Sequence, residues 1–347
     1  MADFVARHED RGTAVATDTA CKWDKPRKTS RPLAVREVDF STPAAKKKRV
    51  APPCSLKKLN EGVLMQDYMD LLGHDSDCVA TQILPLPLPE PDTPQPNLIS
   101  LIKKHYCPGM TAKEVMAELA PEVDDALASK VESATRGQAD NTEWFHQRLG
   151  RLTASKFHDA SRCKGNGRYI VRSVLGNGGH VKTDAMAHGI EHEGAARQLY
   201  IETHLATHKK GLCVESGLHL CLSNPRYAAS PDGLVSCQCC GEGLLEIKCT
   251  SKFKHLTVCE VASQPGYHFE QDENGQPVLK QNSSWYDQVQ GQLYVTQREW
   301  CDFVLYTLNG PLSVQRIYVD EDWVASTIPK LDIFFDSKIF PALLNHQ

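Results

Sequence analysis

The stretch SPDGL (Ser230–Leu234), followed after a short hairpin-like insert by LEIKC (Leu245–Cys249), decides the fold of this chain. In a β-strand, residues two apart point to the same face. Glu246 and Lys248 therefore project together, while the residues that alternate with them face the core. Asp232 lies at the turn that feeds the hairpin. This pattern predicts that three charged groups converge at one edge of a sheet.

Such a group of side chains suits phosphodiester hydrolysis, in which negative charge builds up on the phosphate oxygens. Hard cations such as Mg²⁺ neutralise that charge and prefer oxygen ligands, here the carboxylates of Asp232 and Glu246 with a strand carbonyl, that of Ile247. The ion lowers the pKa of a bound water, and Lys248 beside it can orient or deprotonate that water. The alternative is structural, with an ion pair on a solvated strand face and Asp232 serving as a turn residue.

The bulk composition is that of a soluble globular protein. The chain has 347 residues, of which 41% are hydrophobic and 24% charged. No stretch is apolar over the roughly 18 residues that a membrane-spanning helix needs, and the N-terminus lacks the apolar core of a signal peptide. The 13 cysteines are an odd number, which argues against a disulfide scaffold. We therefore expect an intracellular protein without a membrane partner.

Charge and composition divide the chain in two. Residues 1–60 hold 14 Lys and Arg against 7 Asp and Glu, a net charge of +7, which leaves −11 for the rest. An acidic body of this kind binds DNA only through a local patch and bound cations. We expect residues 1–96 to be a largely disordered basic region, with one short helix at Leu56–Leu72 and a proline-rich linker at Leu84–Pro96. The run Lys46–Arg49 indicates nuclear import or, alternatively, a solvated charge cluster.

Residues 97–347 have the periodicities of a folded α/β domain. Apolar spacing of 3.6 predicts helices before a central group of strands, and further helices between and after the strands. For the helix at Ala185–Thr203 we expect a buried face of Ile190, Ala195, Leu199 and Tyr200. Thr142 is the expected N-cap of the helix that follows it. The expected helices are Leu98–Tyr106, Ala112–Leu127, Thr142–Arg148, Ala185–Thr203, Asn282–Val295 and Asp322–Leu344, and the expected strands are Leu212–Leu222, Tyr227–Ala229, Leu244–Cys249, Cys301–Leu308 and Val314–Val319.

Several blocks in order resemble the YqaJ-type viral recombinase family, which includes lambda exonuclease and belongs to the PD-(D/E)-x-K nuclease superfamily. The resemblance spans roughly residues 130 to 345. It implies a restriction-endonuclease-like α/β fold, with a central mixed β-sheet flanked by helices. The blocks are Thr135–Phe157, HGIEHEGAARQLY (His188–Tyr200), ASPDGLV (Ala229–Val235), LLEIKC (Leu244–Cys249), Tyr286–Thr296 and Cys301–Thr307.

The resemblance implies the identity of the site residues. The family's helix before the sheet supplies a glutamate near the metal ions, which falls on Glu193, and its motif residues fall on Asp232, Glu246 and Lys248. A family glutamine on the following helix falls on Gln288 or Gln290, and Gln288 matches the block better. The cofactor implied is Mg²⁺ or Mn²⁺.

The block R-x-G-x-x-T-A-S implies a second site. In the family its arginine and serine bind the 5′-terminal phosphate of the substrate, and these residues fall on Arg148 and Ser155. The planar guanidinium of arginine suits a phosphate, and a nearby hydroxyl adds a donor. Without the resemblance, the T-A-S segment would be an ordinary helix start.

Cysteines cluster in the insert between the two motif stretches. Cys237 and Cys240 have the C-x-x-C spacing of one half of a zinc site, and Cys239 lies between them. A second pair is not obvious, although Cys213, Cys221 and Cys249 are near in sequence. A structural Zn²⁺ is thus the less favoured interpretation, and we expect free thiols.

Three functions are consistent with these features. The first is a Mg²⁺-dependent deoxyribonuclease, in particular a 5′-to-3′ exonuclease acting on duplex ends in recombination or repair. The second is a structure-specific endonuclease or resolvase of the same fold, because fold does not determine substrate. The third is a non-catalytic nucleic-acid-interaction protein. DNA is the expected partner, and the resemblance adds a ring-shaped homo-oligomer and a single-strand annealing recombinase.

Overall fold

The structure is a computed structural model, and it describes residues 95–178 and 183–345. The predicted helix at Leu56–Leu72, the basic run Lys46–Arg49 and nearly all of the region 1–96 lie outside the described residues. Predictions for that region therefore stay predictions. Within the described ranges, no helix is both long and apolar enough to cross a bilayer.

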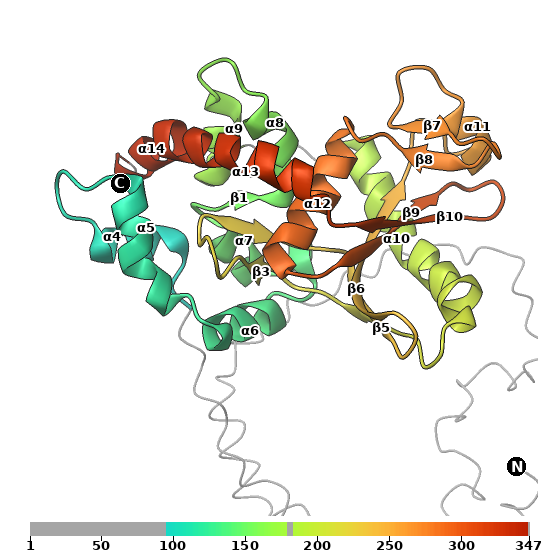
Figure 1. The fold of residues 1–347 in the computed structure, drawn as a ribbon, viewed down its shortest axis with the longest axis horizontal. Coiled ribbons are helices and arrows are strands. Elements are labelled where there is room, and N and C mark those ends of the chain that lie inside the picture. The colour runs from blue at the N-terminus through green and yellow to red at the C-terminus, as the bar shows by residue number, and fades with distance from the viewer. Residues whose placement is uncertain (1–94, 179–182, 346–347) are drawn as a thin grey trace, which may run out of the picture. The chain divides into compact units, whose positions relative to one another are not determined.

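Helices precede, interrupt and follow the strands, as the periodicities predict (Figure 1). Short 3₁₀ turns join several of them, at η4 (Ala120–Glu122), η5 (Gln138–Asp140), η6 (Ala154–Lys156) and η7 (Leu205–Thr207). The α-helices are α4 (Leu98–His105), α5 (Ala112–Leu119), α6 (Asp125–Ala134), α7 (Thr142–Arg148), α8 (Phe157–Ser161), α9 (Arg168–Val174), α10 (Asp184–Thr203), α11 (Val258–Ala262), α12 (Ser284–Thr296), α13 (Glu321–Phe334) and α14 (Phe340–Leu344), with a π-helical turn η8 (Phe335–Ile339) between the last two.

The main sheet has five strands in the order β10-β9-β6-β5-β2. Strands β6 and β9 pair in parallel and the other neighbours are antiparallel, so the sheet is mixed, as expected. A small sheet of order β1-β4-β3 and a hairpin of β7 and β8 complete the strands. Their bounds are β1 (Leu152–Thr153), β2 (Leu212–Glu215), β3 (His219–Leu220), β4 (Tyr227–Ala229), β5 (Gly233–Cys237), β6 (Gly241–Cys249), β7 (Phe269–Gln271), β8 (Pro277–Leu279), β9 (Trp300–Tyr306) and β10 (Ser313–Tyr318).

Both faces of strand β6 are covered by helices. Leu245 and Ile247 pack in one apolar cluster with Ala196 and Tyr200 of α10. Leu244 belongs to a larger cluster that includes residues of α12. This burial on both faces explains why the stretch Leu244–Cys249 of the strand is apolar except at Glu246 and Lys248.

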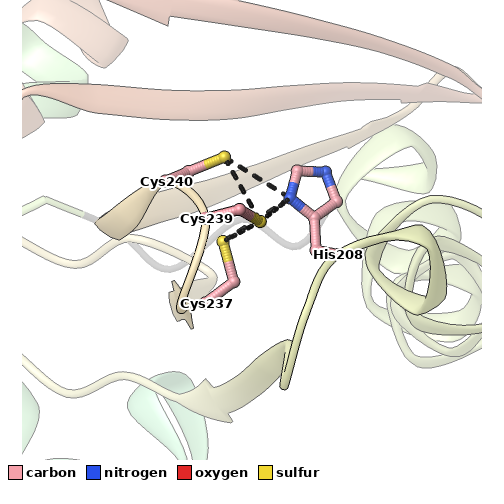
Figure 2. A group of neighbouring side chains, drawn as sticks. All are labelled: His208, Cys237, Cys239 and Cys240. Carbon is pink, nitrogen blue, oxygen red and sulfur yellow. Dashed lines mark hydrogen bonds between the residues drawn. The ribbon is translucent and has the colours of Figure 1, made fainter.

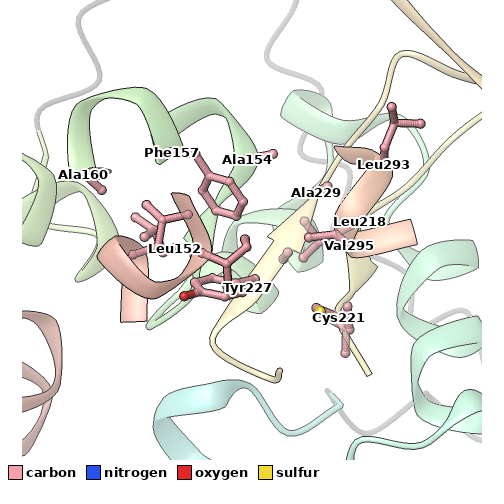
Figure 3. Packing of buried hydrophobic residues seen from close by; sticks show 14 of the residues in the cluster. Leu152, Ala154, Phe157, Ala160, Leu218, Cys221, Tyr227, Ala229, Leu293 and Val295 are labelled. Atoms are coloured by element: carbon pink, nitrogen blue, oxygen red, sulfur yellow. The ribbon is translucent and has the colours of Figure 1, made fainter. Parts of the chain in front are cut away.

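The larger cluster brings α12 close to the small sheet (Figure 3). Phe157 lies edge-on to Tyr227 of β4, with ring centroids 5.2 Å apart. A Cβ at Gly291 would come within 2.6 Å of the Phe157 ring, so only glycine permits this approach of the helix. The same helix carries the glutamines of the block Tyr286–Thr296, and its close packing sets their position over the main sheet.

Two helix boundaries differ from the prediction. The helix expected at Ala112–Leu127 is broken into α5, η4 and α6. Pro121 lacks an amide hydrogen, which interrupts the first helix. Asp124 then caps a new helix, because its Oδ1 accepts from the Leu127 N–H at 2.8 Å. The N-cap of α7 is Asn141 rather than Thr142. The Asn141 side chain accepts from the two N–H groups that follow Thr142, a bond that a residue already inside the first turn cannot make.

The strand material expected at Leu212–Leu222 is divided in the structure. It is two strands in different sheets, β2 and β3, separated at Gly217. A Cβ at Gly217 would lie 1.9 Å from the carbonyl oxygen of Glu132, so the chain turns there against helix α6.

On helix α10 the expected buried face is partly wrong. Ile190 and Ala195 are exposed, whereas Ala196 and Tyr200 are buried. The hydroxyl of Tyr200 donates to the buried Asp302 at 2.7 Å. A polar contact, which hydrophobic periodicity does not record, thus contributes to the orientation of the helix.

Candidate active site

The carboxylate of Glu246 lies between strand β6 and helix α12 and is only 1% exposed. Its Oε1 accepts from Lys248 Nζ at 2.6 Å and from Gln288 Nε2 at 2.6 Å. Its Oε2 accepts from Gln292 Nε2 at 2.7 Å. The buried charge is therefore stabilised by an ammonium group and two amides, as a buried carboxylate requires.

The Lys248 ammonium group lies beside the Glu246 carboxylate, since the two residues are two apart on the same strand. Besides Glu246 it donates to Gln288 Oε1 at 3.1 Å, and its side chain is 21% exposed. Burial by itself would lower the pKa of Lys248, but the Glu246 and Asp232 carboxylates outweigh it and raise the pKa. Lys248 is thus a fixed cation at the boundary between the core and solvent.

Asp232 lies just before β5 and is tied to β6. Its Oδ2 accepts from the Ile247 N–H at 2.7 Å, and its own N–H donates to Leu245 O at 3.0 Å. The N–H and C=O of one strand residue point to the same edge, so the Ile247 carbonyl faces the edge at which Asp232 lies. The structure thus places the predicted carbonyl beside the predicted aspartate.

Glu193 of α10 joins this group through an arginine. Arg197 Nη2 donates to Glu193 Oε1 at 2.6 Å and to the Asp232 carbonyl oxygen at 2.8 Å. Glu193 is therefore linked through Arg197 to the backbone of Asp232, and Asp232 bonds in turn to the backbone of the two residues on either side of Glu246. The sequence analysis missed Arg197, although its i,i+4 spacing from Glu193 is a recognisable pattern on a helix.

The electrostatics of the site suit a divalent cation. Burial raises the pKa of Asp232 well above its usual range, and the Glu246 and Glu193 carboxylates raise it further. Burial also raises the pKa of Glu193, with Arg197 opposing and Glu246 adding to the shift. A bound cation would offset the repulsion that raises the pKa of Asp232 and Glu193, and carboxylate oxygens are the hard donors that Mg²⁺ or Mn²⁺ takes. The donor set therefore fits the implied cofactor.

Of the two glutamines considered in helix α12, Gln288 is the one at the site. Gln290 instead donates to Tyr318 O at 2.8 Å and accepts from the Asp320 N–H at 2.9 Å, so it fastens the helix to the end of β10. Gln292 was missed in the sequence analysis. Its position four residues after Gln288 places it on the same face of the helix, which is the signal that could have found it.

The second predicted site adjoins the first. The Arg148 guanidinium lies over the Trp144 ring, 3.9 Å from its centroid, and burial lowers the pKa of Arg148 to about 10. Trp144 Nε1 donates to Ser230 Oγ at 2.8 Å, two residues before Asp232. Ser155 is exposed in η6, with its Oγ 3.3 Å from Thr153 Oγ1.

A second arginine of this block was not singled out from the sequence. Arg151 is 1% exposed and donates to Gln147 O at 2.6 Å. Within residues 95–178 and 183–345 it has no carboxylate partner, and burial lowers its pKa to about 9. It adds a positive charge beneath the surface near Arg148.

Comparison with known proteins agrees with the motifs. Residues 143–299 match the model of the YqaJ-like viral recombinase domain, and this range contains every residue predicted for the two sites. The match over residues 143–299 confirms the family resemblance inferred from the sequence. The match and the carboxylate–lysine site together support a DNA nuclease.

Solved structures similar to the chain include several exonucleases. An alkaline exonuclease from Laribacter hongkongensis is 26% identical, with 58% of this chain and 94% of that chain covered and a TM-score of 0.44. The Shutoff and Exonuclease Protein from Kaposi's sarcoma associated herpesvirus is 12% identical, with 67% and 77% covered and a TM-score of 0.44. A phage related exonuclease from Haemophilus somnus is 13% identical, with 57% and 96% covered and a TM-score of 0.37. No curated protein gives a significant match to the sequence.

Proposed function

We propose that this chain is a divalent-metal-dependent DNA nuclease, and specifically a 5′-to-3′ exonuclease that acts on duplex ends in recombination or repair. The observation that carries the proposal is the grouping of Glu193, Asp232, Glu246 and Lys248 near one end of β5. Arg197 joins Glu193 to Asp232, Asp232 bonds to the Ile247 N–H, and Lys248 bonds to Glu246. An ion pair on a solvated strand face would leave Glu246 exposed, whereas it is buried and bound by three donors.

Some residues of the site would bind the metal ion, and others would orient the water and neutralise charge. Asp232, Glu246, Glu193 and the Ile247 carbonyl would hold Mg²⁺ or Mn²⁺, which when bound lowers the pKa of a water and stabilises charge on the phosphate. Lys248, fixed by Glu246 and Gln288, orients the attacking water and neutralises developing negative charge. Arg197 holds Glu193 against the loop of Asp232.

The end specificity rests on the neighbouring cationic site. Arg148 has no carboxylate partner among the described residues, and its guanidinium lies over the Trp144 ring, so its donors can bind a phosphate. Because Trp144 is bonded to Ser230, two residues before Asp232, an anchored 5′-terminal phosphate would place the following phosphodiester near the carboxylates. Ser155 supplies a second donor. An oligomeric ring, an annealing recombinase as partner and a nuclear location stay predictions.

The decisive experiment is a cleavage assay on end-labelled linear duplex DNA with Mg²⁺. We expect degradation that is faster from 5′-phosphate than from 5′-hydroxyl ends and that leaves closed circular DNA intact. Lys248→Ala should lower the rate by about 10²-fold or more while the protein remains folded, and the matched variant Lys252→Ala, an exposed lysine in the following loop, should not.

Each part of the proposal has its own contrary result. A folded Lys248→Ala protein with unchanged activity would refute the role of the lysine. Arg148→Ala should abolish the preference for a 5′-phosphate, and an unchanged preference would refute the anchor. Cleavage of closed circles would show an endonuclease instead, and no cleavage by a protein that binds DNA would show a non-catalytic binder.

A further inference from the structure

A histidine and three cysteines meet at the turn between β5 and β6 (Figure 2). The cysteines are Cys237, Cys239 and Cys240, and the histidine is His208, which follows η7. The four ligand atoms all lie within 4.8 Å of one another. From the sequence we expected free thiols because a second cysteine pair is not obvious, and the fourth donor comes instead from 29 residues upstream.

The distances are those of tetrahedral coordination. His208 Nδ1 lies 3.5 Å from Cys237 Sγ, 3.3 Å from Cys239 Sγ and 3.5 Å from Cys240 Sγ. The Cys239 sulfur lies 3.3 Å from the Cys237 sulfur and 3.8 Å from the Cys240 sulfur. A zinc ion with bonds of about 2.3 Å to sulfur and 2.0–2.1 Å to nitrogen places its ligand atoms roughly 3.5–3.8 Å apart. Hence an ion at the centre fits with little movement.

Backbone N–H groups bond to two of the three sulfurs. Backbone N–H groups of Cys239 and Cys240 bond to the Cys237 sulfur, and that of Lys209 bonds to the Cys239 sulfur. Zinc with three thiolates and one neutral imidazole carries a net charge of −1, and Arg316, which bonds to Asp302 and also to Cys240, supplies a positive charge nearby. Outer contacts of this kind orient and support metal ligands.

The backbone near the four ligands is already fixed. Gln238 N–H donates to Lys209 O at 2.8 Å, and Trp300 Nε1 donates to Cys240 O at 3.1 Å. Gly241, directly after the last cysteine, has a φ of 74°, a turn conformation that glycine adopts readily. The ligands are therefore held by contacts beyond their own side chains.

We propose that His208, Cys237, Cys239 and Cys240 form a structural zinc site that fastens the β5–β6 turn to the segment following α10. Four protein ligands close the coordination sphere, which is the arrangement of a structural rather than a catalytic site. Cys237 is five residues along β5 from Asp232, about 17 Å at 3.3 Å per residue. The site thus links the hairpin of Asp232, Glu246 and Lys248 to the helix of Glu193 without touching the nuclease chemistry.

The first test is the zinc content of the full chain, expressed without a metal-binding tag and purified under reducing conditions with zinc present. We expect close to one zinc per chain by mass spectrometry of the metal. Cys239→Ser and His208→Ala should lose it, with an affinity loss above the roughly 10–100-fold that outer contacts are worth. The matched controls Cys107→Ser, an exposed cysteine elsewhere, and His192→Ala, from the other described histidine group, should retain it.

Two further measurements cover the case in which the variants fail to fold. His208→Cys replaces one zinc ligand by another and should keep the metal. In the wild-type chain, Co²⁺ should give the thiolate charge-transfer bands of tetrahedral coordination, and a mercurial reagent should release zinc as the thiols react. A zinc-free wild-type protein with no cobalt–thiolate bands, or equal zinc in wild type and Cys239→Ser, would overturn the proposal. None of these measurements depends on nuclease activity.

Discussion

Replacing Gln292 by methionine tests whether the second amide on Glu246 positions the candidate active site. Gln292 is 1% exposed, and among the described residues its amide is the one donor to Glu246 Oε2, at 2.7 Å. Methionine has a similar length but no donor, so the substitution leaves an oxygen of a buried carboxylate unpaired. Lost hydrogen bonds to charged groups cost about 1.5–3 kcal/mol. In a domain of this size that corresponds to a fall of about 3–12 °C in Tm.

The matched control is Gln290→Met on the same helix. Gln290 is equally buried, and its substitution loses two hydrogen bonds to backbone groups of β10 and the loop after it, whereas Gln292→Met loses one to the Glu246 carboxylate. We expect both variants to lose stability by a similar amount when followed by thermal or urea unfolding. Only Gln292→Met should in addition lower kcat for DNA cleavage and raise the Mg²⁺ concentration needed for half-maximal rate.

The contrast between the two variants carries the test. If Gln292→Met and Gln290→Met lose stability equally and keep the same kcat and the same Mg²⁺ requirement, the amide of Gln292 has only a structural role. If Gln292→Met is as stable as the unchanged protein, Glu246 is not held as the structure shows. A Gln292→Glu variant should be worse than either, because it adds a like charge beside a buried carboxylate.

Two further predictions concern stability. Asp302 is fully buried and accepts from Arg316 Nε and Nη2 at 2.8 and 2.9 Å. Asp302→Asn should therefore lower the free energy of unfolding, measured with a chemical denaturant, by about 3–5 kcal/mol. A loss below about 1 kcal/mol would contradict a buried ion pair. Burial lowers the pKa of His219 to about 4, against the opposing charge of Glu132, so the unfolded chain takes up its proton first as the pH falls. Stability should be independent of this group above pH ~6.5 and should fall by up to about 3 kcal/mol towards pH ~4, and His219→Gln should flatten that part of the profile.

Local pattern was sufficient for much of the site. Alternation along β6 predicts that Glu246 and Lys248 share a face, and the structure shows them 2.6 Å apart. The family blocks place Glu193 and Gln288 near them, although one lies about 50 residues before Glu246 and the other about 40 after it. Those two positions came from the resemblance, since spacing in the sequence says nothing of distance across a sheet.

Helix boundaries were predicted less well, because competing caps lie side by side. Asn141 and Thr142 are both good capping residues, and the choice depends on where the backbone first turns helical. The break between α5 and α6 has a local cause in Pro121 and Asp124, which the apolar periodicity of the stretch concealed.

The sequence by itself determined the strand bearing Glu246 and Lys248, the turn that holds Asp232 and the family that residues 143–299 match, because these depend on neighbours in the chain. Only the tertiary structure decided that Gln292 rather than Gln290 supports Glu246, that Arg197 bridges Glu193 to Asp232, and that His208 completes the set of three cysteines. Each of these contacts joins elements that are distant in sequence. Their partners are set by the packing of helices on the two faces of one sheet, and residue spacing carries no record of that packing.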